Sequence, residues 1–163
     1  MTRAQIVGPD ILDEPFPIEF IGSVIKGFGR GSKELGIPTA NVSPRVIPRA
    51  LQEMLSGVYF GWARVINDRK EDSEVFPMCM SLGYNPFYNN KTRSAEVHIM
   101  HKFEDDFYGK ELRAVVLGFI RTEQDYPGLD ELIQDIQTDI MVTERSLARE
   151  AYQSYKYDDF LLK

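Results

Sequence analysis

The feature that most constrains the fold is a series of short apolar stretches, each ending at turn residues. The stretches are rich in β-branched and aromatic side chains, which favour strands. Five strands are predicted, over residues 16–25, 57–66, 75–84, 94–101 and 112–121. Parallel strands need long crossovers that are usually helical, so the short spacing favours antiparallel hairpins. The sequence therefore predicts a mainly β protein whose antiparallel sheet closes into a barrel, which leaves no sheet edge unpaired.

A helical period replaces the strand period near residue 128. Ile133, Ile136, Ile140 and Leu147 recur at helical spacing and predict one long helix packed outside the barrel. A shorter helix is predicted over residues 47–55. The 163 residues are predicted to form one domain, with an N-terminal arm over 1–16, a barrel over 17–121, the long helix over 128–154 and a tail over 155–163.

Composition excludes several classes of protein. A net charge of −6 argues against nucleic acid as a bulk partner, and no run approaches the roughly 20 apolar residues of a membrane span. The single cysteine, Cys79, lies between two methionines, so a buried thiol is expected and an internal disulfide is excluded. We therefore expect a cytoplasmic protein in a reducing compartment, with mitochondrial association left open.

Residues 27–41, with the sequence GFGRGSKELGIPTAN, form the main candidate for a ligand loop. Glycine backbone N–H groups and nearby cations suit a phosphate. The candidate anion-binding residues are Lys26, Gly27, Gly29, Gly31, Ser32 and Lys33. Thr39 and Asn41 offer neutral oxygen ligands two residues apart, which suits Mg²⁺ that shares its coordination shell with phosphate.

Two other readings of this loop are available. A Walker-type P-loop is disfavoured, because the order is Gly-Ser-Lys and because Gly36, Pro38 and Pro44 would interrupt the helix that should follow. The glycines could instead form a tight turn at a barrel corner. Thr39 and Asn41 could likewise hydrogen-bond their own backbone, as such residues commonly do in loops.

The stretch from Ser94 to His101 alternates in polarity. Ala95, Val97 and Ile99 share one face, and Glu96 and His98 lie on the opposite face. Glu96 is either a solvated surface residue or, at the mouth of a small barrel, a carboxylate that can act as a general base. His98 shares this face and is a further candidate ligand-binding residue, although a lone histidine more often has a packing or hydrogen-bonding role. The two histidines and one cysteine have no zinc-ligand spacing.

With these residues laid out, the chain resembles the riboflavin kinase (flavokinase) family. The resemblance rests on residues 27–41 and on GVYFGW at 57–62, SLGYNP at 81–86, EVHIMH at 96–101 and FYG at 107–109. It extends over roughly residues 18–150. The chain resembles the stand-alone eukaryotic form, because nothing in it could be the adenylyltransferase domain that is fused to bacterial relatives.

The resemblance implies a closed six-stranded antiparallel Greek-key barrel, one strand more than the pattern predicts. It also implies that Thr39 and Asn41 serve the metal and phosphates, and that Glu96 is the catalytic base. The glycine loop and the 104–109 connection would close over the substrates. The resemblance places Arg121 and the start of the long helix at the isoalloxazine ring, and Asn89 and Lys91 near the nucleotide.

The expected activity is transfer of phosphate from ATP to the 5′-hydroxyl of riboflavin, which gives FMN and ADP. Mg²⁺ is the expected metal, with Zn²⁺ and Mn²⁺ as alternatives, and a monomer is expected. The competing hypotheses are a flavin-binding barrel without kinase activity and a kinase for another small alcohol. A base at Glu96 favours an enzyme, because a binding module has no use for one.

Overall fold

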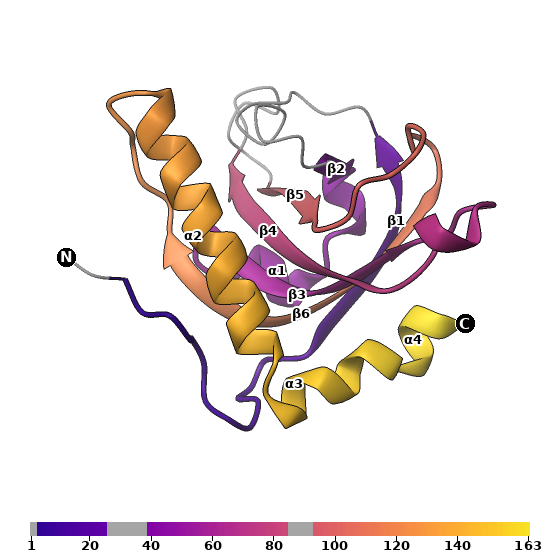
Figure 1. The fold of residues 1–163 in the computed structure, drawn as a ribbon, viewed down its shortest axis with the longest axis horizontal. Coiled ribbons are helices and arrows are strands. Elements are labelled where there is room, and N and C mark those ends of the chain that lie inside the picture. The colour runs from indigo at the N-terminus through magenta and orange to yellow at the C-terminus, as the bar shows by residue number, and fades with distance from the viewer. Residues whose placement is uncertain (1–2, 26–38, 85–92) are drawn as a thin grey trace.

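The computed structural model describes residues 3–25, 39–84 and 93–163, and six strands form a closed antiparallel barrel (Figure 1). The strands are β1 (Ile18–Ile25), β2 (Thr39–Val42), β3 (Gly57–Val65), β4 (Phe76–Tyr84), β5 (Arg93–Ile99) and β6 (Glu111–Thr122), in the order β1-β2-β5-β4-β3-β6. The predicted closed barrel is confirmed, and so is the sixth strand that the resemblance implies. That strand is β2, within the stretch that the residue pattern treats as loop.

The strand order is that of a Greek key. β3, β4 and β5 are successive antiparallel neighbours, and β6 returns to pair with β3 on its other side. Three hairpin-type neighbours and a fourth strand beside the first define the motif. β1 then pairs with β6 and β2 pairs with β5, and the β1–β2 pairing closes the barrel.

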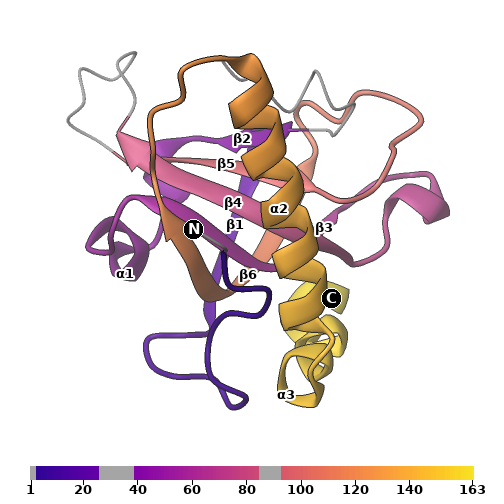
Figure 2. The ribbon, with the colours of Figure 1, turned by 60° about the vertical axis from the view of Figure 1, so that its left-hand side comes forward.

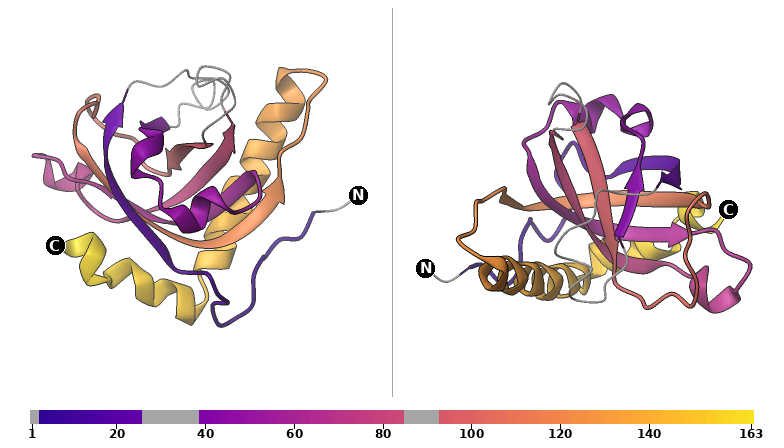
Figure 3. Two further views of the ribbon diagram at one scale, coloured as in Figure 1. Left: turned by 180° about the vertical axis from the view of Figure 1, so that it is seen from behind. Right: turned by 90° about the horizontal axis from the view of Figure 1, so that it is seen from above.

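Alternate residues of every strand fill the barrel interior, as the two-residue period of a strand requires. The inward set includes Ile18, Phe20, Val24, Ala40, Val42, Tyr59, Met80, Leu82, Ala95, Val97, Ile99, Leu112 and Ala114. A short 3-10 helix, η2 (Pro44–Val46), and the helix α1 (Arg49–Gln52) lie over one end of the barrel (Figure 3). Ile47 and Leu51 extend from this segment into the core. The regular helix here is shorter than the predicted range of 47–55.

The long helix α2 (Leu129–Leu147) crosses the outer face of β4, β3 and β6 (Figure 2). It ends before the predicted residue 154, because the backbone of Arg149 is extended and the Arg149 guanidinium holds the carbonyl oxygens of Val7 and Gly8 at 2.6 and 2.7 Å. The chain continues through α3 (Glu150–Gln153), a 3-10 turn η5 (Ser154–Tyr157) and α4 (Asp159–Leu162). The predicted tail is thus folded, with Leu161 fully buried.

The N-terminal arm lies along α2 and α3 rather than in the barrel. The Ser146 hydroxyl accepts a hydrogen bond from the Val7 backbone N–H at 3.1 Å, and the Tyr152 hydroxyl donates to the Pro9 carbonyl at 2.6 Å. A second apolar cluster fills the space between β3, β6 and the C-terminal segments, and includes Phe60, Trp62, Leu117, Leu147, Tyr152 and Leu161. The protein therefore has one apolar core inside the barrel and a second between the barrel wall and the C-terminal segments.

Cys79 lies under α2 and is buried, as its apolar neighbours predict. Its sulfur is 2.8 Å from the Thr143 hydroxyl, and burial raises the pKa of the thiol to about 12. A thiol with such a pKa stays protonated and unreactive near neutral pH. As for membranes, the described segments contain no helix that combines the length and the apolar character needed to cross one.

Candidate active site

Four of the candidate residues lie together on the paired strands β2 and β5. Thr39 pairs with His98, and Asn41 pairs with Glu96. Directly opposed residues of an antiparallel ladder point to the same side, with Cβ atoms about 5 Å apart. Because the intervening residues of both strands face the core, these four side chains are on the outer face of the barrel wall. The oxygens proposed for a metal and the proposed base are therefore nearest neighbours.

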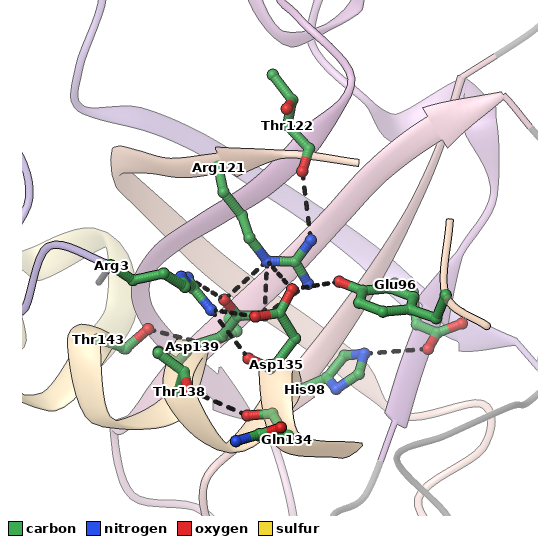
Figure 4. A network of polar contacts seen from close by, with 12 residues as sticks. Arg3, Glu96, His98, Arg121, Thr122, Gln134, Asp135, Thr138, Asp139 and Thr143 are labelled. Atoms are coloured by element: carbon green, nitrogen blue, oxygen red, sulfur yellow. Dashed lines mark hydrogen bonds and ion pairs between the residues drawn. The ribbon is translucent and has the colours of Figure 1, made fainter. Parts of the chain in front are cut away.

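Glu96 is half-buried, and its carboxylate is oriented by a neighbour on its own strand. His98 Nε2 lies 3.1 Å from Glu96 Oε1, and the side chains of Glu96 and His98 keep 26% and 11% of their exposure. Figure 4 shows the imidazole turned toward the carboxylate. The sequence leaves open whether this face is a solvated surface or lies at the mouth of the barrel, and in the structure it is the outer face of the wall. A fixed, partly exposed carboxylate can still accept a proton from a bound hydroxyl.

The row of paired residues that contains Asn41 and Glu96 continues across three more strands. Glu96 pairs with Ser81 of β4, Ser81 with Val58 of β3, and Val58 with Arg121 of β6. Neighbouring strands are about 5 Å apart. An extended molecule laid across the wall could thus touch Asn41 with one end, pass Glu96, and reach Arg121 with the other.

An open cavity of about 450 Å³ lies over the end of this row that Ser81, Val58 and Arg121 form. It is lined by Val58, Ser81, Arg121, Glu123, Gln124, Asp125, Tyr126 and Leu132, from three strands, the segment after β6 and the first turn of α2. That volume is within the range of small-molecule sites. The start of the long helix, which the sequence resemblance assigns to the flavin ring, therefore does form part of a cavity.

Arg121 faces this cavity because β6 is irregular. The β3–β6 register shifts twice, and the second shift separates the Tyr59–Phe119 pair from the Val58–Arg121 pair. Phe119 packs with Tyr59 against the interior cluster. In a regular strand Arg121, two residues later, would also face inward. The extra residue of the bulge turns it to the outer face, an effect of bulges that is common beside active sites.

The Arg121 guanidinium is held by a carboxylate of α2. Nε lies 2.9 Å from Asp139 Oδ1, and Nη2 lies 2.9 Å from Asp139 Oδ2. Burial disfavours the charge on Arg121, but the hydrogen bonds and charge of Asp139 outweigh it and raise the pKa of the guanidinium. A bidentate arginine–carboxylate pair fixes both position and orientation. The side chain is therefore a rigid, permanently charged part of the cavity wall.

The donor set on β2 and β5 fits a small hard cation that is only partly coordinated by protein. The side chains of Thr39 and Asn41 share one face of a short strand, and the Glu96 carboxylate lies beside Asn41. Mg²⁺ prefers oxygen ligands and commonly completes its octahedral shell with phosphate oxygens and water. Two neutral ligands beside one carboxylate suit a metal that arrives bound to a nucleotide.

Eight of the predicted ligand residues lie outside the described parts of the chain. They are Lys26, Gly27, Gly29, Gly31, Ser32, Lys33, Asn89 and Lys91. The described residues that flank the first segment are Ile25 and Thr39, and Ile25 pairs with Asn41. The 104–109 connection is described, with exposed acidic residues at 104–106 and with Phe107 anchored in the core.

Sequence reasoning did not identify three polar residues of this region, Arg3, Asp135 and Asp139. The two carboxylates lie four residues apart on α2, close to its apolar stripe, and Asp139 is only 4% exposed. A carboxylate at a buried helical position is the one sequence signal that could have identified Asp139, because such a group needs a cationic partner.

Comparison with known proteins identifies the family. The family model described as "Flavokinase: Riboflavin kinase" matches residues 14–147. The riboflavin kinase of Pyricularia oryzae is 51% identical, over 93% of this chain and 82% of that protein, and the riboflavin kinase of Scheffersomyces stipitis is 43% identical, over 96% and 99%. The crystal structure of riboflavin kinase from Trypanosoma brucei superposes with a TM-score of 0.71 at 24% identity, over 93% of this chain and 91% of that one, and supports the fold. The chain therefore belongs to the riboflavin kinase family of enzymes.

Proposed function

We propose that this chain transfers the γ-phosphoryl group of ATP to the 5′-hydroxyl of riboflavin, with Glu96 as the general base. The observation that carries the proposal is the single row on the barrel wall, in which Asn41, Glu96 and Ser81 are successive cross-strand neighbours. Ser81 lines the 450 Å³ cavity. A flavin ring in the cavity would place its ribityl chain over Glu96 and toward Asn41.

In this arrangement the Glu96 carboxylate takes the proton of the ribityl hydroxyl as the hydroxyl oxygen attacks the γ-phosphorus. The bond from the γ-phosphorus to its bridging oxygen breaks, and ADP leaves. His98, 3.1 Å from Glu96, holds the base in place. Phosphoryl transfer depends mainly on positioning and charge stabilisation. A fixed base beside the proposed phosphate site would orient the attacking hydroxyl and accept its proton.

Thr39 and Asn41 are the residues proposed to hold a divalent cation, for which Mg²⁺ is our choice. When bound, the cation would neutralise charge on the transferring phosphate. The protein's own part is to present the Thr39 and Asn41 oxygens in fixed register beside Glu96. The glycine-rich segment between Ile25 and Thr39 is proposed to bind the nucleotide phosphates, on the chemistry of its glycines, Ser32 and Lys33.

The flavin ring is proposed to bind between Arg121, Tyr126 and Leu132 in the cavity. Leu132 supplies apolar surface and Tyr126 an aromatic face. Asp139 and the Thr122 carbonyl engage three of the five N–H groups of Arg121, and the others can donate to a carbonyl oxygen at the ring edge. A mostly planar ligand with a polar edge fits this combination.

The direct test is to incubate the protein with MgATP and riboflavin and to measure FMN by chromatography. Formation of FMN that depends on all three components is expected. Riboflavin binding with no FMN would favour the flavin-binding barrel. Phosphorylation of other alcohols without riboflavin binding would favour a kinase with another substrate. Either result would overturn the proposal.

Asn41→Ala tests the metal site. The substitution should weaken Mg²⁺-dependent nucleotide binding by about 10-fold, because one oxygen ligand is lost. Titration calorimetry of a non-hydrolysable ATP analogue at several Mg²⁺ concentrations would measure this. Asn67→Ala is the matched control, since Asn67 lies in the β3–β4 connection, away from the row, and its side-chain oxygen accepts a hydrogen bond from the Arg69 backbone N–H. An unchanged Mg²⁺ dependence in Asn41→Ala would remove Asn41 from the metal site.

A further inference from the structure

Two carboxylates on α2 hold one side chain of the N-terminal arm and two from the end of β6 and the segment after it (Figure 4). Asp139 accepts hydrogen bonds from Arg121 at 2.9 Å and from Arg3 Nη2 at 2.6 Å. Asp135, one helical turn earlier, accepts from Arg3 Nη1 at 2.8 Å and from the Tyr126 hydroxyl. We call these five residues the α2 network. Their charges balance, since two guanidinium groups face two carboxylates.

Only part of the α2 network lines the cavity of the proposed flavin site. Arg121 and Tyr126 are in the cavity wall, whereas Arg3, Asp135 and Asp139 are not among the lining residues. Asp139 binds Arg121, Asp135 binds the Tyr126 hydroxyl, and Arg3 binds both carboxylates. Arg3 and Asp135 also line a neighbouring open cavity of about 460 Å³, which shares Gln124 and Tyr126 with the first. The α2 network therefore supports the side of the proposed flavin site that adjoins this second cavity.

Residues of the α2 network also shift the pKa values of one another. Burial alone would raise the pKa of Asp135, but the Tyr126 hydrogen bond and the charges of Arg121 and Arg3 outweigh it and lower that pKa. Burial and the hydrogen bond to Asp135 raise the pKa of Tyr126 to about 12. Tyr126 therefore stays a neutral donor and Asp135 a charged acceptor across the physiological range.

Without Arg3, the single charge of Arg121 would face both carboxylates. Arg121 Nε already lies 3.7 Å from Asp135 Oδ2, so the guanidinium has a second acceptor within reach. Movement toward Asp135 would disturb the bidentate contact with Asp139 and the Tyr126 hydrogen bond together. Arg3 is a second, partly buried cation, and it prevents this competition because it supplies positive charge to both carboxylates.

We propose that Arg3 is a positioning residue, which acts through Asp135 and Asp139 to fix Arg121 and Tyr126 in the wall of the flavin site. The N-terminal arm would thereby be part of the substrate site, although Arg3 lies outside residues 14–147 that match the family model. This inference rests on the proposed function, since it takes the cavity as the flavin site.

The N-terminal arm is also held by contacts outside the α2 network. The positioning role of Arg3 can therefore be tested without detaching the arm. Val7 and Gly8 are held by Arg149, Pro9 by Tyr152, and Gln5 by Arg145 of α2. Arg3→Met removes the charge but keeps an unbranched apolar stem, so the arm should stay in place. Arg145→Met is the matched control, because it removes another arginine contact between the arm and α2 that lies outside the α2 network.

The experiment measures riboflavin affinity by quenching of flavin fluorescence, together with kcat and the KM values for riboflavin and ATP. Arg3→Met should raise the Kd and KM for riboflavin by about 10-fold, the usual scale for loss of a supporting contact, and change the KM for ATP less than about 2-fold. Arg3→Lys should recover much of the affinity, and Arg145→Met should match the unmodified protein.

Each outcome bears on the inference. Unchanged riboflavin affinity in Arg3→Met, or an equal loss in Arg145→Met, would overturn it while FMN formation by the unmodified protein still supports the proposed function. Weaker flavin binding in Arg3→Met, in a protein that forms no FMN, would support the inference and overturn the proposed function. Failure of the unmodified protein to bind riboflavin would overturn both.

Discussion

Glu96→Gln is expected to lower kcat for FMN formation by about 10²-fold or more, with riboflavin and ATP binding largely retained. Gln has nearly the same size as Glu and can still hydrogen-bond His98, which lies 3.1 Å away, but an amide cannot take the proton of the ribityl hydroxyl. Initial rates at saturating substrate, with binding of each substrate measured separately, would test this.

Glu111→Gln is the matched control. Like Glu96, Glu111 is a strand carboxylate with a hydrogen-bond partner two residues away, here the Arg113 side chain at 2.7 Å. Glu111 lies at the start of β6 and outside the row that contains Glu96. It should leave kcat unchanged. If Glu96→Gln lost binding as much as turnover, Glu96 would be a structural residue and not a base.

Gly61→Ala is expected to lower the free energy of unfolding by about 3 kcal/mol or more. A Cβ at residue 61 would lie 1.9 Å from the backbone oxygen of Val115 and 3.1 Å from the Met78 methyl group. β3 pairs with a neighbour on each side, so the backbone cannot move away from β6 without disturbing β4. Thermal unfolding should show Tm about 10 °C lower for a chain of this length.

Gly128→Ala provides the comparison. Among the described residues, a Cβ there would meet only the end of the Glu131 side chain, at 3.0 Å, and that side chain can move. A change of less than about 1 kcal/mol is expected at this helix-capping position. Similar stability for Gly61→Ala and the unmodified protein would mean that β3 and β6 can separate more easily than their close contact indicates.

The barrel could be predicted from the sequence because most of its strands are long enough to show a two-residue period. β2 could not, since its four residues follow directly on glycines and a proline and are too short for a clear alternation. The bulges of β6 are also invisible to a pattern that assumes regular alternation. They decide which way Arg121 points, so the sequence could name that residue without predicting its direction.

The end of α2 illustrates a further limit. The helical period continues past Leu147, but Arg149 adopts an extended backbone while its side chain binds Val7 and Gly8. The α2 network could not be predicted for the same reason, because Arg3 and Asp139 are 136 residues apart in the sequence. Local propensity carries no information about contacts of this range. Thr39 and Asn41 could be named from their chemistry, and Glu96 and His98 from the alternation of their strand, whereas the resemblance adds the roles of Thr39, Asn41 and Glu96. That the four share one face follows from a register that only the fold provides.

The pairing of the earliest and latest parts of the chain has a consequence for synthesis on the ribosome. β1 needs β6 as a partner, and Arg3 needs a carboxylate made 136 residues later. At about 5–20 residues per second, the emerging chain would wait roughly 5–30 s for those partners. During that time the apolar face of β1 is open to wrong pairing. A chain truncated before α2 would lack Leu132 and the two carboxylates of the α2 network, and with them part of the wall of the proposed flavin site.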